Sequence, residues 1–337
     1  MLDHPVPIIS LCMPTYNRAG MVREAIDSIL AQTFADFELI VSDNASTDGT
    51  EDVIRSYKDP RIVYSCNPTN IGCHHNINKC LSLAKGEFIG IFMDDDIMMP
   101  DNLSQKMALF RKHPSVGLVH SKYHVIDGAG ALVRSNTNWG HGPDRDTDVV
   151  EDGQEVLKQM LLSRNIINMP TVVFRRCCYE QLGGFDDAFA HADDWEYWMR
   201  IAVHYDIGFI ASPLVKWRVH SGSLTSTEVQ SRNTFLSHEG LREELLAKRM
   251  ILMRYGHKIR EGRDLMRRVQ AEASVRVLEH LNIHMGGGGP NKPVRNFILK
   301  VWRDFPELFG SFEVWKLFVK SVLPVGRISD GGKRSFL

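Results

Sequence analysis

The chain lacks the features that would assign it to several common protein classes. It has only six cysteines among 337 residues, and none forms a C-x-x-C pair, so neither a disulfide scaffold nor a structural zinc site is expected. No run approaches the roughly 20 consecutive apolar residues that span a bilayer. The first five residues have neither the cationic start nor the apolar core of a signal peptide. The sequence therefore predicts a cytoplasmic protein with reduced thiols.

Two nucleotide-binding motifs are also missing. The chain has no G-x-G-x-x-G and no G-K-[ST], which argues against Rossmann dehydrogenases and P-loop enzymes. The glycine-rich run Gly286–Gly289 follows no expected strand and opens no helix, so it is interpreted as a hinge or linker.

The chain has little net charge, but its charged residues are unevenly distributed. The net charge is −1, yet residues 1–224 hold 20 Lys and Arg against 29 Asp and Glu, whereas residues 225–337 hold 20 against 12. Such asymmetry predicts two regions with different partners. We therefore expect a domain over residues 1–224, with halves of about 1–115 and 116–224, and a basic helical extension over 225–337.

Apolar runs and helical periodicity alternate along the first half of the chain. Runs at 8–13, 37–41, 61–65 and 87–93 are typical of buried strands, and helical patterns at 21–32, 50–57 and 76–84 separate them. This order predicts an α/β fold with a doubly wound, mostly parallel sheet. Further strands are expected at 116–120, 131–133 and 171–174, with an irregular mobile loop over 136–152.

Three consecutive carboxylates, Asp94, Asp95 and Asp96, follow the apolar run 88–93 directly. Like charges at this spacing repel one another and raise each other's pKa, unless a hard divalent cation lies among them. Ligands of open α/β sheets bind beyond the carboxyl ends of strands, so a cation that bridges the protein to phosphates fits this position. A solvated acidic turn that leads into a helix is the alternative.

A second acidic cluster, Asp193–Asp194, begins a helical pattern about a hundred residues further on. A carboxylate at such a position can accept a proton from a bound hydroxyl group. The alternative is ordinary acidity at a helix start, which the helix dipole favours. The pairs His74–His75 and His120/His124 have no carboxylate at ligand spacing and are expected to be structural.

Several motifs in order resemble the family-2 glycosyltransferases of GT-A fold, in particular those that build bacterial cell-surface polysaccharides. The resemblance covers about residues 7–222. Its motifs are Pro14–Arg18, Asp43–Thr50, Asn70–Gly72, Gly86–Ile89, Asp94–Asp96, Gly183–Asp186, Asp193–Asp194 and Val219–Ser223. Ile97 follows the triplet, and Asn44–Ala45 stands where many members have Asp-Gly.

The resemblance implies a role for each matching position. Asp194 would be the catalytic base, with Asp193 as its rival. The metal, Mn²⁺ or Mg²⁺, would be bound by Asp96 and Asp94, with His220 near the metal or diphosphate. The nucleotide sugar would be bound by Pro14, Thr15, Tyr16, Arg18, Asp43, Asp94 and Asp95.

These roles imply an inverting transfer of a sugar from a nucleotide-diphosphate sugar to an acceptor hydroxyl group of a glycan or lipid-linked saccharide. UDP is the expected nucleotide, with dTDP or GDP as alternatives. The same carboxylates have two other interpretations, a sugar-1-phosphate nucleotidyltransferase and a non-catalytic carbohydrate-binding protein. The first usually has a glycine-rich loop after its first strand, which Pro14–Arg18 is not.

Residues 296–323 mix Trp, Phe and Leu with Lys and Arg. This pattern suits an amphipathic helix pair on the anionic inner face of a membrane. Packing on the catalytic domain, or on a second subunit of a homo-oligomer, is the alternative. The aromatic residues lie on apolar faces, so we expect no binding of nucleic acid.

Overall fold

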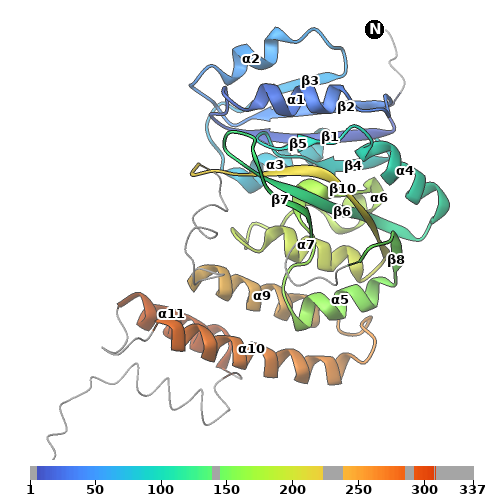
Figure 1. Cartoon of the computed structure of the whole chain (residues 1–337). Helices are drawn as coiled ribbons and strands as arrows, with labels where there is room; N and C mark the ends of the chain where they lie inside the picture. Colours follow the sequence, from blue (N-terminus) through green and yellow to red (C-terminus); the bar gives the residue numbers. More distant parts are fainter. Residues whose placement is uncertain (1–5, 139–144, 223–237, 285–291, 307, 309–337) are drawn as a thin grey trace, which may run out of the picture.

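A mixed ten-stranded sheet forms the centre of the molecule (Figure 1). The computed structural model describes residues 6–138, 145–222, 238–284, 292–306 and 308. The strand order is β3-β2-β1-β4-β9-β6-β10-β5, with β7 paired to β6 and β8 paired to β10. The strands are β1 (Ile9–Thr15), β2 (Phe37–Asp43), β3 (Ile62–Cys66), β4 (Phe88–Ile91), β5 (Ile97–Met98), β6 (Val116–Asp127), β7 (Leu132–Thr137), β8 (Val149–Glu151), β9 (Val173–Arg175) and β10 (Asp206–Val219).

Helices cover both faces of this sheet, and three more follow in the C-terminal region (Figure 1). They are α1 (Val22–Leu30), α2 (Thr50–Ser56), α3 (Cys73–Leu83), α4 (Asn102–Lys112), α5 (Gly153–Leu162), the 3₁₀ helix η1 (Met169–Thr171), α6 (Arg176–Leu182), α7 (Asp193–Ala202), α9 (His238–Tyr255), α10 (Gly262–His284) and α11 (Lys292–Asp304). The predicted α/β class with a helical C-terminal region is confirmed.

The first four strands form the parallel part of the sheet that positions the candidate site. β1 pairs in parallel with both β2 and β4, and β2 pairs in parallel with β3. The strand order therefore reverses at β1, and the carboxyl ends of β1, β2 and β4 meet at one edge. This is the position at which open α/β sheets bind ligands. The polar residues at these three strand ends therefore lie at the same edge of the sheet.

Two apolar cores sandwich the sheet. One core contains buried residues of α1, α2 and α4, and the other contains residues of α3, α5 and α7. The second core also includes Ala247 and Ile251 of α9 and Leu265 of α10. Burial of this apolar area supplies the main driving force for folding. The C-terminal helices therefore share a core with the helices that carry the second acidic cluster.

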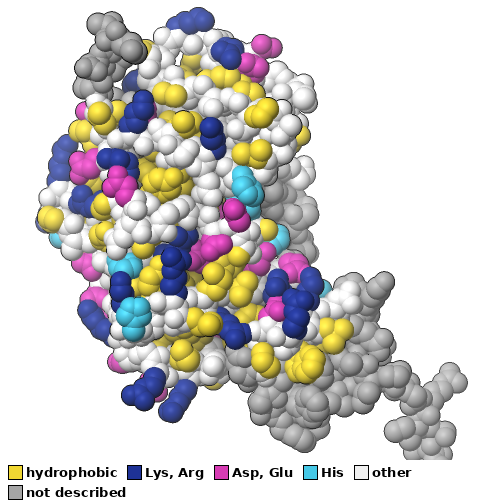
Figure 2. Space-filling view, turned by 180° about the vertical axis from the view of Figure 1, so that it is seen from behind, with side chains coloured by type: hydrophobic (Ala, Val, Ile, Leu, Met, Phe, Trp, Pro, Cys, Tyr) yellow, Lys and Arg dark blue, Asp and Glu magenta, His cyan; other side chains and the backbone are white. Residues whose placement is uncertain are grey.

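The amphipathic α11 buries its apolar face within the molecule. Val294, Phe297, Ile298 and Val301 lie in a third cluster with residues of α9 and α10. The helix therefore packs on α9 and α10 within the predicted extension, and not on the catalytic domain that the packing alternative named. Residues 309–323 of the predicted pair and the tetraglycine run lie outside the described residues. No helix in the described segments has the length and apolarity needed to cross a membrane. Acidic and basic side chains are interspersed over the face that Figure 2 shows.

Two local predictions were wrong. The expected loop over 136–152 contains β8, which pairs antiparallel with β10, a partner more than fifty residues away that no local pattern reveals. The strand expected at 171–174 is divided into η1 and β9, because Pro170 lies in the first turn of η1 and has no N–H group for a strand ladder.

β10 is the longest strand and connects several parts of the sheet. It runs parallel to β6 with register shifts at Asp206/Ile207, Ile210/Pro213 and Pro213/Lys216. It also pairs with β8 and β5. Its last residues reach the acidic triplet from the opposite side to β4.

The start of α5 gives a testable prediction about packing. A Cβ atom on Gly153 would lie 2.0 Å from the Tyr205 carbonyl oxygen and 2.5 Å from that of Ala202. Because backbone atoms cannot give way cheaply, Gly153→Ala should lower the free energy of unfolding by about 1–3 kcal/mol. Chemical denaturation measures this. A Cβ atom on Gly20 meets nothing within 4 Å, so Gly20→Ala should stay within about 0.5 kcal/mol of the wild type. Equal effects of the two substitutions would contradict the packing argument.

Candidate active site

The residue that ends β1 and the loop after it face the acidic triplet. Pro14 and Thr15 are buried in the strand, while Tyr16 is exposed. Arg18 places its Nε atom 3.6 Å from Asp94 Oδ1, and its Nη2 donates to the Gly222 carbonyl oxygen at 2.8 Å. Arg18 therefore connects the first strand loop to the triplet and to the end of β10.

Asp43, the last residue of β2, is buried and fully engaged. Its Oδ1 accepts from the Ser46 amide at 2.9 Å, and its Oδ2 accepts from the Tyr64 hydroxyl at 3.0 Å. The next residue, Asn44, donates to Asn70 Oδ1 at 2.8 Å and accepts from the Ile71 amide at 2.9 Å. Asn44, which stands where many of the family-2 enzymes have Asp, therefore links the loop after β2 to the motif at 70–72.

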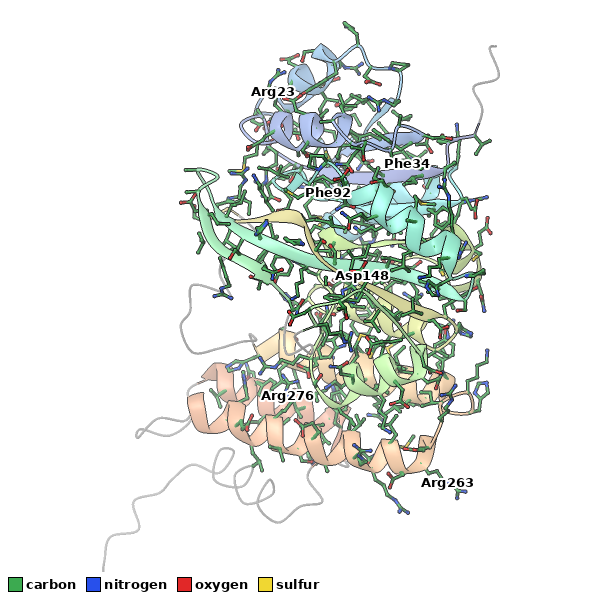
Figure 3. The ribbon with its side chains drawn as sticks, turned by 45° about the vertical axis from the view of Figure 1, so that its right-hand side comes forward. Arg23, Phe34, Phe92, Asp148, Arg263 and Arg276 are labelled. Atoms are coloured by element: carbon green, nitrogen blue, oxygen red, sulfur yellow. The ribbon has the colours of Figure 1, made fainter. Side chains whose placement is uncertain are left out.

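The acidic triplet follows β4 and Phe92, which Figure 3 labels. Asp94 and Asp96 are buried, and Asp95 is partly exposed. Burial and then the Asp95 charge raise the pKa of Asp94 to about 7, against the opposing effects of Thr15 and Arg18. Burial and the Asp95 charge also raise the pKa of Asp96. Asp94 and Asp96 are thus both held where a negative charge is costly.

Arg218, the penultimate residue of β10, holds the triplet in place. Its backbone amide donates to Asp96 Oδ1 at 2.7 Å, and its Nε donates to the Asp95 carbonyl oxygen at 2.6 Å. Its Nη2 pairs with Glu24 of α1. Asp96 Oδ2 is buried and has no hydrogen-bond partner among the described residues.

His220 has both ring nitrogens engaged. The Gly222 amide donates to Nδ1 at 3.2 Å, so the proton resides on Nε2, which lies 2.9 Å from Asp95 Oδ2. In this state His220 orients Asp95. Its role as a metal ligand stays a prediction and requires one ring nitrogen to be released.

A divalent cation that also binds phosphates fits this donor set. The buried, unpartnered Asp96 Oδ2 and the nearby Asp94 are hard oxygen donors. No group of three or more His, Cys, Asp or Glu within the described part of the chain could hold a metal by itself. Mg²⁺ commonly binds through one or two carboxylates, with substrate phosphates and water completing its coordination.

The second acidic cluster occupies the first turn of α7. Asp193 is buried, and His74 Nδ1 of α3 lies 2.6 Å from its Oδ2. That contact with Asp193 raises the pKa of His74. Sequence spacing gave no sign of this carboxylate partner of His74, because the partner lies 119 residues away in sequence. His120 matches its structural prediction, since it is buried beside Phe209 and burial lowers its pKa to about 3.

Asp194 has a different environment from Asp193. Its Oδ2 accepts from Asn165 Nδ2 at 3.0 Å. Burial and then the Asp193 charge raise the pKa of Asp194 to about 8. A carboxylate with a pKa near neutral pH is suited to accept a proton.

Cys73, the first residue of α3, is near enough to both clusters for a carboxylate of each to act on its thiol. Burial, and after it the charges of Asp193 and Asp94, raise the pKa of the Cys73 thiol to about 12, while Arg18 acts in the opposite direction. The pKa of this single side chain is therefore affected by one carboxylate of each cluster and by the arginine of the β1 loop. The clusters converge on one region although they are about a hundred residues apart in the chain.

The fold and these contacts agree with comparisons to known proteins. The family profile described as Glycosyl transferase family 2 matches residues 10–161. Just under half of the chain is therefore similar to this family. The chain is 27% identical over 252 residues to an uncharacterized glycosyltransferase of Rickettsia typhi, which covers 74% of this chain and 76% of that protein.

Solved structures of other proteins share the fold. TarS 1–349 from S. aureus, in complex with UDP-GlcNAc, has a TM-score of 0.60 and 18% identity, and the match covers 93% of this chain and 79% of that chain. The mannosyltransferase PcManGT from Pyrobaculum calidifontis, in complex with GDP-Man and Mn²⁺, has a TM-score of 0.53 and 19% identity, with coverage of 95% and 88%.

The unpartnered oxygen of Asp96 gives a prediction about the cation. Without metal at pH 8, Asp96→Asn should raise the free energy of unfolding by roughly 1–3 kcal/mol, because an amide avoids the cost of keeping a carboxylate in this buried position. The same variant should lose the stabilisation that Mn²⁺ plus UDP is expected to give the wild type in thermal unfolding. Asp52→Asn is the matched control, since Asp52 is an exposed carboxylate of α2 and its substitution should stay within about 0.5 kcal/mol of the wild type. A less stable Asp96→Asn that still responds to Mn²⁺ would contradict the cation site.

Proposed function

We propose that the protein is a metal-dependent, inverting glycosyltransferase that moves a sugar from a nucleotide-diphosphate sugar to an acceptor hydroxyl group. The observation that carries this proposal is the convergence of the two acidic clusters around Cys73. One cluster suits a cation and a diphosphate, and the other suits a proton acceptor. The similarity to the family and the fold support the same assignment.

Each residue then has a defined task. Asp96 and Asp94 would hold Mn²⁺ or Mg²⁺, which when bound neutralises charge that develops on the departing diphosphate. Arg18, beside Asp94, adds a fixed positive charge to the same region. Thr15, Tyr16 and Asp43 lie at the ends of β1 and β2, where the nucleotide would bind.

Asp194 is the group we assign as the base, and Asp193 the group that His74 holds. Asp194 removes the proton of the acceptor hydroxyl as its oxygen attacks the anomeric carbon and the bond to the diphosphate breaks. Attack from the face opposite the leaving group inverts the anomeric configuration. Asp193, in contrast, has an oxygen committed to His74 at 2.6 Å.

The finer identity of the substrates stays a prediction. UDP is our first choice of nucleotide, with GDP and dTDP as alternatives, and the acceptor would be a glycan or lipid-linked saccharide at the inner face of a membrane. The exposed Leu299 and Trp302 of α11, with Lys300 and Arg303 on the same helix, support contact with an anionic surface. Homo-oligomer formation also stays a prediction.

A panel of nucleotide sugars tests the reaction class. Incubation of the full-length protein with UDP-, GDP- and dTDP-sugars, Mn²⁺ and saccharide acceptors should release the nucleoside diphosphate and an anomerically inverted product. EDTA should abolish the release. Production of pyrophosphate or its consumption would instead indicate a nucleotidyltransferase, and binding without turnover would indicate a carbohydrate-binding protein.

Asp194→Asn tests the assigned base. Transfer should fall on the order of 10²–10⁴-fold, because the amide cannot accept the proton, whereas donor binding measured by calorimetry should persist. The wild-type rate should rise with pH and level off above about 8, because burial raises the pKa of Asp194 to about 8 and only the ionised form acts as a base.

Asp193→Asn is the matched control, since its side chain can still accept from His74, and a smaller loss of about tenfold is expected. Unchanged turnover in Asp194→Asn, or a larger loss in Asp193→Asn, would reverse the assignment.

A further inference from the structure

A side chain of the C-terminal region contacts the backbone immediately before the second acidic cluster. Glu243 of α9 is 7% exposed, and its Oε2 accepts from the amides of Ala190 at 2.8 Å, His191 at 2.6 Å and Ala192 at 3.2 Å. Three backbone donors on one carboxylate oxygen form a strong, charge-assisted set of contacts.

This contact lies at the N-cap residue of α7 and at the two residues before it. The N-cap residue is Ala192, whose side chain cannot accept a hydrogen bond. A negative charge close to a helix start is favourable. Glu243 supplies this charge, and an acceptor for the Ala192 amide, from a helix that lies some fifty residues further along the chain. The two residues that follow this segment are Asp193 and Asp194.

Glu243 also acts on the partner of Asp193. The charge of Glu243 contributes, after Asp193 itself, to the raised pKa of His74, and His74 has a backbone hydrogen bond with Ala190. The segment that Glu243 holds therefore contacts the same imidazole that holds Asp193.

A second set of contacts from α9 reaches the partner of Asp194. Lys248 Nζ donates to the Ser163 carbonyl oxygen at 2.8 Å and pairs with Glu244 at 2.9 Å. Arg276 of α10, labelled in Figure 3, also donates to the Ser163 carbonyl oxygen and pairs with Glu244. Ser163 lies two residues before Asn165, whose amide donates to Asp194. Buried charges with these partners form a fixed framework.

We propose that α9 positions the catalytic carboxylates, and that Glu243 is a positioning residue for the base. The inference rests on the proposed function, because it assumes that Asp194 accepts the acceptor proton. It assigns to the C-terminal helical region a part in catalysis, through the backbone ahead of α7, without contact with the substrate.

The test compares Glu243→Ala and Glu243→Gln in the full-length protein. Misplacement of a reacting group by about 1 Å can cost about 10²-fold in rate, so kcat of Glu243→Ala should fall by about that factor. The donor KM and the Mn²⁺-dependent binding of UDP should change less than about twofold, because the donor residues lie on other strand ends. Glu243→Gln keeps one acceptor oxygen without the charge, and its kcat should be intermediate.

Hydrogen exchange supplies a measurement that does not depend on turnover. The peptide that contains residues 190–192 should exchange faster in Glu243→Ala than in the wild type, because its amides lose their acceptor. Glu239→Gln is the matched control on the same helix, since Glu239 pairs with Arg242 and Lys300. It should keep both the wild-type kcat and the wild-type exchange.

The outcomes separate the two proposals. Wild-type turnover with an unchanged kcat in Glu243→Ala overturns the positioning role and leaves the proposed function intact. Equal losses of kcat and UDP affinity in both Glu243 variants mean general destabilisation and also overturn it. A wild type that transfers no sugar overturns the proposed function, and the positioning role with it, even if exchange at 190–192 responds.

Discussion

Buried negative charge is the constraint on which the rest of this site depends. Asp94 and Asp96 at the end of β4, and Asp193 at the start of α7, are all withdrawn from water. Each such charge is expensive unless it is paired or hydrogen-bonded. The fold meets this requirement with groups from distant segments: Arg18 from the β1 loop, Arg218 from β10 and His74 from α3.

The compensation is incomplete in a way that suits a reaction. One oxygen of Asp96 has no partner among the described residues, and the pKa of Asp194 is raised to about 8 by burial and by Asp193. If every carboxylate oxygen in the site were paired, the site could neither bind a cation nor accept a proton. The hydrogen-bond partners that are present restrict how the carboxylates move, and the oxygen without a partner is where a ligand could bind.

Local patterns were enough to predict the sheet edge. The apolar runs before Thr15, Asp43 and the triplet predicted three parallel strands, because continuous apolar runs and turn residues are properties of neighbouring residues. The order of motifs then located Asp193–Asp194. β8 was missed because three residues carry no periodic signal.

The partners of the carboxylates were beyond the reach of local patterns. His74 and Asp193 are 119 residues apart, and Arg218 and Asp96 are 122 apart. Glu243 belongs to the C-terminal region, whose excess of Lys and Arg predicted only a basic helical extension. Polar contacts between such segments arise when tertiary packing brings the segments together, so a sequence can show that Arg218 is present without showing what it holds. The one local hint was the absence of a capping side chain at Ala192.

The register shifts of β10 link strand pairing to chemistry. Because Arg218 is the penultimate residue of a fourteen-residue strand that pairs with β5, β6 and β8, its position depends on every shift upstream of it. Slippage by one residue would turn the arginine to the other face of the sheet. An insertion or deletion between Asp206 and Pro213 would thus alter the acidic triplet from across the molecule. Among related chains, changes in the length of this strand would then have to be accompanied by changes in how Asp96 is held.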